Sequence, residues 1–169
     1  ILDDNNLREI WKVLPNARLV GGCVRDNLLN LSPKDIDLAT PENPETVLKL
    51  FSDKGYQVIE TGISHGTVTI MINGTGYEIT TLRKDVLTDG RHAIVEYVSD
   101  WETDHNRRDF TINAMYIDKN GKLYDYSNGK QDLENNTIKF VGNAEERIKE
   151  DSLRILRYFR FVSRFKSYN

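Results

Sequence analysis

Two alternating runs joined by Asn73-Gly74 are the feature that most constrains the fold. Thr67-Val-Thr-Ile-Met-Ile places an apolar side chain at every second position, and Tyr77-Glu-Ile-Thr-Thr-Leu does so again after the turn. A period of two is typical of a strand with one buried face, and Asn-Gly between two such runs is the strongest local signal of a β-hairpin. The sequence therefore predicts an antiparallel pair, with Glu78 on the face opposite Tyr77 and Ile79.

Apolar spacing assigns most of the remaining chain to short helices and strands. Side chains at three- and four-residue intervals predict helices, and short apolar runs bounded by Gly, Pro or Asn predict strands. The expected helices are 6–14, 24–29, 45–54, 129–133 and 144–165, and the expected strands are 17–20, 35–40, 56–59, 67–72, 77–82, 114–118, 123–126 and 138–141. Residues 83–101 show no firm pattern and predict a long loop, which in a compact domain is usually mobile or functional.

Charge and cysteine content restrict the class of protein. The 169 residues correspond to one domain, or to one domain and the start of another. Cys23 is the single cysteine, which excludes an internal disulfide and suits a reducing compartment such as the cytoplasm. The net charge of −3 argues against wholesale binding of nucleic acid, although the segment from Arg147 onward is basic. No apolar run approaches a membrane span of about 20 residues and no signal peptide is visible, so we expect no membrane partner.

Leu19 to Thr40 holds two features that together suit chemistry on phosphates. Gly21-Gly22 ends an apolar run and begins a helix, and the N–H groups at a helix N-terminus attract anions. In the strand that follows, Asp35 and Asp37 would share one face, roughly 7 Å apart along the chain. Two such carboxylates repel each other unless a cation lies between them. Either feature alone is usually only a turn or a surface pair, but together they are what phosphoryl or nucleotidyl transfer requires.

Three other groups of charged residues have ordinary interpretations when considered alone. Arg107-Arg108-Asp109 is most simply a solvent-exposed cluster, and a lone acid on a strand such as Glu78 usually faces solvent. In the last helix, Asp151, Arg154 and Arg157 are spaced so that neighbouring members lie close on one helix surface. That spacing by itself predicts a salt-bridged surface helix.

Taken together, these segments resemble the head domain of the class II tRNA nucleotidyltransferases, which are the CCA-adding enzymes and their bacterial poly(A) polymerase relatives. The resemblance rests on GGCVRD at 21–26, DIDLAT at 35–40, RRDFTINA at 107–114 and EDSLRILRYFRF at 150–161, with weaker likeness in YEITTLR at 77–83, TDGRHA at 88–93 and GKQDL at 129–133. It implies an α+β fold, the nucleotidyltransferase (polymerase-beta-like) head, in which helices flank a small mixed sheet. This head would occupy 1–142, and 143–169 would begin an all-α neck.

The resemblance also implies roles for the matching residues. Asp35 and Asp37 would hold two Mg²⁺ ions, with Glu78 as a further catalytic carboxylate. Arg108 would reach phosphate and Asp109 the ribose hydroxyls. The implied nucleotide-binding set is Gly21, Gly22, Arg25, Arg108, Asp109, Asn113, Asp151, Arg154, Arg157 and Arg160.

The resemblance further implies that base selection comes from Asp151 and Arg154, on the helix that begins the neck. Asp151 can only accept hydrogen bonds and Arg154 can only donate them. Such a pair suits the edges of C and A and is mismatched to U and G, so the protein would replace a template strand. Asp125 and Asp132 are expected to be structural, because caps and turns are the commoner use of such residues.

The implied activity is template-independent addition of C and A residues to tRNA 3′ ends from CTP and ATP, with release of pyrophosphate. A bacterial poly(A) polymerase, or an enzyme that adds only part of CCA, stays an alternative, although TGISHGTVTI at 61–70 looks like the CCA-adding enzymes. A third possibility is a non-catalytic module that binds nucleotide or RNA. The intact pair of Asp35 and Asp37 argues against it, because a module that only binds needs no metal site. We also expect this chain alone to bind nucleotide but to transfer poorly, because a net charge of −3, without the helical body of the family, leaves little to hold tRNA.

Overall fold

A seven-stranded mixed sheet forms the centre of the protein, in the strand order β3-β4-β5-β2-β1-β8-β9. The computed structural model describes residues 1–88, 93–150 and 153–166. The strands are β1 (Arg18–Val20), β2 (Ile36–Thr40), β3 (Gln57–Ile59), β4 (Thr67–Ile72), β5 (Thr75–Thr81), β8 (Met115–Ile117) and β9 (Leu123–Asp125). The pair β2–β5 is parallel and the other neighbouring pairs are antiparallel. The predicted α+β fold with a mixed sheet is confirmed.

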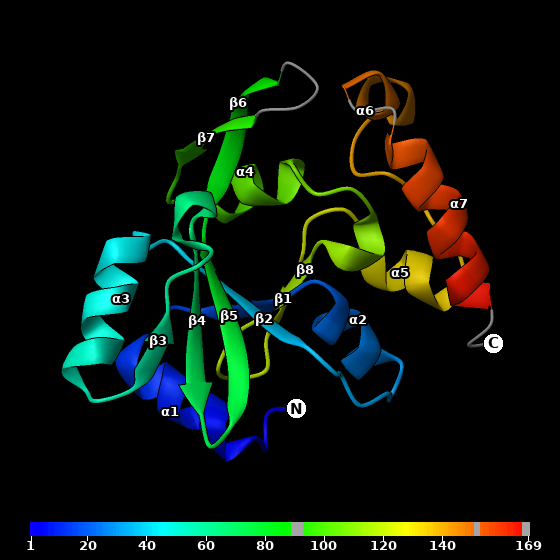
Figure 1. Cartoon of the computed structure of the whole chain (residues 1–169). Coiled ribbons are helices and arrows are strands. Elements are labelled where there is room, and N and C mark those ends of the chain that lie inside the picture. Colours follow the sequence, from blue (N-terminus) through cyan, green and yellow to red (C-terminus); the bar gives the residue numbers. More distant parts are fainter. Residues whose placement is uncertain (89–92, 151–152, 167–169) are drawn as a thin grey trace.

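Helices lie around this sheet, as Figure 1 shows. They are α1 (Asn5–Val13), α2 (Gly22–Leu28), α3 (Pro44–Asp53), α4 (Trp101–Asn106), α5 (Gly129–Glu134), α6 (Ala144–Glu150) and α7 (Leu153–Lys166), with 3-10 turns at Ile63–His65 and Thr111–Asn113. Of the helix expected over 144–165, the structure describes α6 and α7, and residues 151–152 between them lie outside the described residues. Within the described residues, no helix is long and apolar enough to cross a membrane.

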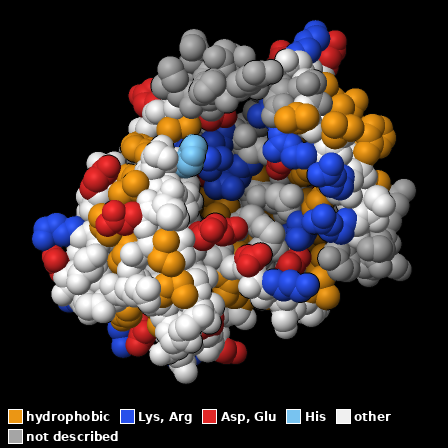
Figure 2. All heavy atoms as spheres, in the orientation of Figure 1, with side chains coloured by type: hydrophobic (Ala, Val, Ile, Leu, Met, Phe, Trp, Pro, Cys, Tyr) orange, Lys and Arg blue, Asp and Glu red, His pale blue; other side chains and the backbone are white. Residues whose placement is uncertain are grey.

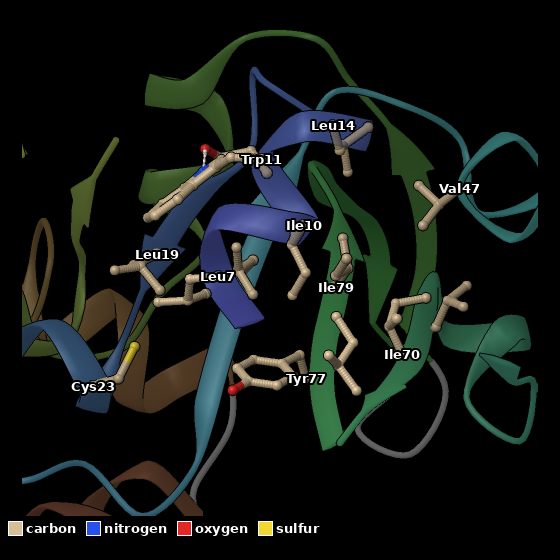
Figure 3. Packing of buried hydrophobic residues seen from close by; sticks show 14 of the residues in the cluster. Leu7, Ile10, Trp11, Leu14, Leu19, Cys23, Val47, Ile70, Tyr77 and Ile79 are labelled. Carbon is tan, nitrogen blue, oxygen red and sulfur yellow. Dashed lines mark hydrogen bonds between the residues drawn. The ribbon is translucent and has the colours of Figure 1, made fainter. Parts of the chain in front are cut away.

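The main core lies between α1, α3 and one face of the sheet. Figure 3 shows Leu7 and Ile10 of α1, and Leu14 directly after it, directed at buried side chains of the sheet, among them Tyr77 and Ile79 of β5. Burial of such apolar side chains contributes about 1.5–3 kcal/mol each. The sheet residues of opposite parity, Glu78 among them, therefore face away from this core, as the alternating pattern predicts.

The prediction of a long loop at 83–101 is wrong, because most of this segment forms a second sheet. β6 (Arg83–Thr88) pairs with β7 (Ala93–Tyr97) as an antiparallel hairpin. Lys84, Asp85 and Val86 are all exposed, so at these three successive positions of β6 no buried face produces an alternating pattern. A register shift between Asp85 and Leu87 further disrupts the alternation. Of the segment TDGRHA, residues 89–92 lie outside the described residues.

The prediction of a strand at 138–141 is also wrong. Phe140 forms only an isolated antiparallel bridge with Phe110. Two backbone hydrogen bonds continue the contact, because the Thr111 N–H donates to the Lys139 carbonyl and the Val141 N–H donates to the Asp109 carbonyl. Residues 111–113 then turn into a 3-10 helix, so the ladder cannot lengthen into a strand.

An aromatic cluster fixes α7 against the rest of the protein. Phe161 stacks on Phe110 with ring centroids 5.3 Å apart, and Tyr158 stacks on Phe140 at 5.8 Å. Aromatic pairs of this kind contribute about 0.5–1.5 kcal/mol beyond their buried area. The cluster directs one side of α7 at the segment that follows α4, whereas Phe159 on another side is 63% exposed.

Candidate active site

The parallel pairing of β2 with β5 places carboxylates side by side. Asp37 is the register partner of Glu78, and Glu78 is in turn the partner of Thr69 on β4. Asp35 lies in a bend one residue before β2, so the predicted strand started one residue too early. It nevertheless reaches the same place. A cavity of about 320 Å³ is lined by Asp35, Ile36, Asp37, Thr69, Gly76 and Glu78.

The electrostatics of this acidic cavity favour a bound cation. Burial, together with hydrogen bonding to Glu78 and repulsion from Glu78 and Asp35, raises the pKa of Asp37 to about 6. Gly76 keeps the cavity open, because a Cβ there would lie 3.3 Å from the Thr69 Cγ2 atom and 3.4 Å from the Met71 Sδ atom. Carboxylate oxygens around an open cavity are the donors that Mg²⁺ accepts.

The donor set fits Mg²⁺ better than an ion that needs a closed cage. Among the described residues, no three His, Cys, Asp or Glu side chains are gathered closely enough to form a complete metal site. Mg²⁺ usually keeps several waters and takes one or two carboxylates together with substrate phosphates. Asp35 and Asp37, with Glu78 alongside, can supply such an incomplete shell.

A second cavity, of about 290 Å³, lies next to the acidic one. It is lined by Gly21, Gly22, Arg25, Arg107, Arg108, Asp109, Asn113, Arg154 and Arg157. We call it the arginine pocket. Val20 of β1 pairs with Asp37 of β2, and Gly21 directly follows Val20. The glycine turn therefore lies beside the acidic cavity. Figure 2 shows Lys and Arg side chains on both sides of the central hollow, with Asp and Glu side chains near its lower edge.

The glycine turn forms one wall of the arginine pocket. Gly21 has a φ of 81°, a left-handed conformation that glycine adopts at little cost, and it caps the N-terminus of α2. Arg25, one turn into α2, donates from Nη1 to the Asn113 Oδ1 atom at 2.8 Å and from Nε to the Asp26 Oδ1 atom at 3.0 Å. These bonds fix the guanidinium, and Gly22 leaves room beside it, since a Cβ there would lie 3.4 Å from Nη2.

Arg107 and Arg108 form the floor of the arginine pocket, next to the C-terminus of α4. Both guanidinium groups pair with the buried carboxylate of Asp104, at 3.1 and 3.0 Å. Sequence reasoning assigned Arg108 to the site but missed Arg107 and Asp104. The adjacent arginine in RRDFTINA was a signal for Arg107, but nothing in the local sequence distinguished Asp104 from an exposed helix acid.

The last wall comes from α7. Arg157 Nη1 lies 3.7 Å from Asp109 Oδ2, which links the helix to the RRDFTINA segment. Arg154 also lines the pocket. Arg160 is exposed and does not line this cavity, because further steps of three residues carry it round the helix. Asp151 lies outside the described residues.

Asp125 and Asp132 have the structural contacts expected of them. Asp125 accepts from the Gly129 N–H at 2.7 Å and from the Lys130 N–H at 3.0 Å, at the start of α5. Asp132 is buried and accepts from the Thr111 hydroxyl at 2.7 Å. These bonds support the segment behind RRDFTINA and lie outside both cavities.

Comparison with known proteins adds a family and several relatives. A family model described as the poly A polymerase head domain matches residues 17–139. CCA tRNA nucleotidyltransferase 1, mitochondrial, of Homo sapiens is 51% identical over 148 residues, which are 87% of this chain and 34% of the human protein. The CCA-adding enzyme of Ligilactobacillus salivarius is 46% identical over 149 residues, which are 87% of this chain and 36% of that enzyme. The chain thus spans about a third of the length of these relatives.

Solved structures give the same result. The crystal structure of the Bacillus stearothermophilus CCA-adding enzyme in complex with CTP superposes with a TM-score of 0.80 at 36% identity, covering 95% of this chain and 40% of that one. A tRNA nucleotidyltransferase complexed with a primer tRNA and an incoming ATP analog superposes with a TM-score of 0.74 at 32% identity, covering 94% of this chain and 44% of that one.

Proposed function

Since the chain belongs to the poly A polymerase head-domain family, we propose that it is the catalytic head of a tRNA nucleotidyltransferase. It adds C and A residues to the 3′ end of tRNA from CTP and ATP and releases pyrophosphate. One observation carries the proposal: the acidic row of Asp35, Asp37 and Glu78 opens next to a pocket lined by arginines. The relatives named as CCA-adding enzymes, and the solved complexes with CTP and with a primer tRNA, support the choice of substrates.

The two cavities divide the work of the reaction. In our proposal the triphosphate lies along Gly21, Gly22, Arg25 and Arg108, with its α-phosphate toward the acidic row. The tRNA 3′-hydroxyl attacks the α-phosphorus while the bond to the bridging oxygen breaks and pyrophosphate leaves. The arginines stabilise the negative charge on the leaving group, and such stabilisation by preorganised charges is usually the largest single contribution to catalysis. Two Mg²⁺ ions bound by Asp35 and Asp37 would acidify the attacking hydroxyl and neutralise the triphosphate.

Asp109 and α7 would recognise the rest of the nucleotide. Asp109 is partly exposed and its Oδ2 atom lies 3.7 Å from Arg157, so a ribose hydroxyl could donate to it without displacing a buried bond. Arg154, across the pocket, would donate to the base edge. The complementary acceptor in this proposal is Asp151.

We place the boundary between head and neck at residues 142 and 143. The family match ends at 139, and α6 begins at Ala144. The neck still contributes to the site, because Arg154 and Arg157 come from α7. The cytoplasmic location expected from a single thiol stays a prediction, and the human relative carries the word mitochondrial in its name.

Product analysis with the full-length protein tests the proposal. A tRNA that ends before CCA is incubated with labelled CTP and ATP, with Mg²⁺ or with a chelator, and the added tail is sequenced. We expect metal-dependent addition of CCA. A long adenosine tail would instead identify a poly(A) polymerase, the activity in the name of the matching family. Addition of only C or only A would identify a partial enzyme. Nucleotide binding without any incorporation would identify a non-catalytic module.

A further inference from the structure

The most heavily bonded carboxylate in the described part of the chain belongs to Asp104, which sequence reasoning left without a role. Its Oδ1 atom accepts from the Arg83 N–H at 3.2 Å and from the Arg107 Nε at 3.1 Å. Its Oδ2 atom accepts from the Arg108 Nε at 3.3 Å, from the Arg108 Nη2 at 3.0 Å and from the Tyr116 hydroxyl at 2.6 Å. The side chain is 1% exposed, so this carboxylate is bound entirely by the protein and does not face the pocket.

Two neighbouring arginines need such a partner. Arg107 and Arg108 are adjacent in sequence, their side chains are each 16% exposed, and both line the arginine pocket. Burial lowers the pKa of Arg107, and repulsion from Arg108 lowers it further, while the Asp104 carboxylate opposes both effects. Burial would raise the pKa of Asp104, but the two arginines hold it below its ordinary value. The carboxylate therefore stays charged and compensates the pair.

The contacts of Asp104 also fix the orientation of the two guanidinium groups. Asp104 engages Arg108 through two nitrogens, and Tyr116 adds a third contact because its hydroxyl oxygen lies 3.2 Å from the Arg108 Nε. Arg107 is held through Nε at the other carboxylate oxygen. A guanidinium bound at one edge by a buried acid has few alternative orientations, so its position is settled before a ligand enters.

We propose that Asp104 is a positioning residue that sets Arg107 and Arg108 for binding of the nucleotide triphosphate. It touches neither the nucleotide nor the reacting atoms and acts through the two arginines. This inference rests on the proposed function, because it assumes that the arginine pocket receives the phosphates of CTP and ATP. It adds a residue from α4 to the site and makes Tyr116 of β8 its support.

The change in net charge of the pocket and the loss of arginine positioning have opposite effects on the affinity of an Asp104 variant for CTP. Asp104→Asn removes a negative charge beside two arginines, so the pocket becomes more positive and charge alone would tighten phosphate binding. If Asp104 positions the arginines, the same change weakens binding, because the asparagine amide adds a donor facing donors. We expect the affinity for CTP to fall by about tenfold, on the scale of a lost hydrogen bond to a charged group.

Binding is measured by calorimetry on the full-length protein with CTP, and with cytidine as a ligand that lacks phosphate. For Asp104→Asn the loss should appear with CTP and stay below about twofold with cytidine. In turnover assays KM for CTP should rise while kcat changes much less. The matched control is Asp132→Asn, which removes another buried carboxylate charge but lies outside the arginine pocket.

Unchanged or tighter CTP binding by Asp104→Asn, or an equal loss for CTP and cytidine, would overturn the positioning role. If that variant does not fold, Tyr116→Phe replaces it, since it removes one hydroxyl and keeps the ring. We then expect a smaller loss, about threefold, again confined to CTP, and no loss would overturn the role. Failure of the unmodified protein to bind CTP would refute the proposed function instead.

Discussion

Asp37 should destabilise the metal-free protein at neutral pH. Its ordinary pKa of 3.8 is raised to about 6, first by burial and then by Glu78 and Asp35. The folded state therefore holds a proton more tightly than the unfolded chain does. Between about pH 4 and pH 6 the folded state is the more protonated one, so the free energy of unfolding falls as pH rises through this window. Above about pH 6 the whole penalty is present.

The size of the effect follows from the same values. The difference between 3.8 and about 6 corresponds to about 3 kcal/mol, at about 1.4 kcal/mol for each pH unit. Asp37 is only half-buried, so solvent screening reduces the expectation to about 1–2 kcal/mol. Asp37→Asn should therefore raise the stability of the metal-free protein by about this amount at pH 7 and change it little below pH 4. Glu78 hydrogen-bonds to Asp37 and repels its carboxylate, so Glu78→Gln should act in the same direction, and the two gains should not add.

Urea unfolding in the presence of a chelator, from pH 4 to pH 8, measures this. Asp53→Asn is the control, because Asp53 is an exposed carboxylate at the end of α3 and does not line the acidic cavity. Addition of Mg²⁺ should erase the difference, since a bound cation removes the repulsion. Loss of stability in Asp37→Asn at pH 7, or a gain that does not vary with pH, would refute the reasoning.

Three further outcomes concern the reaction of the full-length enzyme. Asp35→Ala and Asp37→Ala should each lower transfer by about 10²–10³ at saturating Mg²⁺, with unchanged circular dichroism, and near-normal turnover would remove the metal assignment. Asp109→Ala should narrow the preference for ATP over dATP by about 1–3 kcal/mol in single-nucleotide incorporation, whereas unchanged ribose discrimination would count against its role. Arg154→Ala should relax selection toward UTP and GTP, and an equal loss of rate with all four nucleotides would return Arg154 to an ordinary surface role.

Local pattern predicted the parts of the fold that have one buried face. The alternation around Asn73-Gly74 identified both strands of the β4–β5 hairpin, and Glu78 lies on the face opposite the core, as expected. Period two predicted that Asp35 and Asp37 share a face, although Asp35 lies just outside β2, whereas only the family resemblance placed Glu78 beside them. The β6–β7 hairpin escaped prediction because Lys84, Asp85 and Val86 are exposed in succession, so these positions show no alternation between a buried and an exposed face.

Site residues could be predicted where they belong to one sequence motif. They could not be predicted where their hydrogen-bond partners come from distant parts of the chain. Arg108 and Asp109 belong to one recognisable segment. Two partners of the Asp104 carboxylate come from elsewhere in the fold, because β6 brings the Arg83 N–H and β8 brings the Tyr116 hydroxyl to it. Those partners are 21 and 12 residues away, beyond the reach of any local pattern.

The parallel pairing of β2 with β5 also bears on the order of folding. Asn73 and Gly74 alone separate β4 from β5, so that hairpin closes a short loop, whereas residues 41–74 separate β2 from β5. Loop closure over a longer segment costs more entropy and slows pairing. The register that joins Asp37 to Glu78 should therefore form after the hairpin, and pulse-labelling of amide protons should show β5 protected on its β4 side first. A newly made chain would then acquire its native-like hairpin before it acquires the capacity to bind a metal ion.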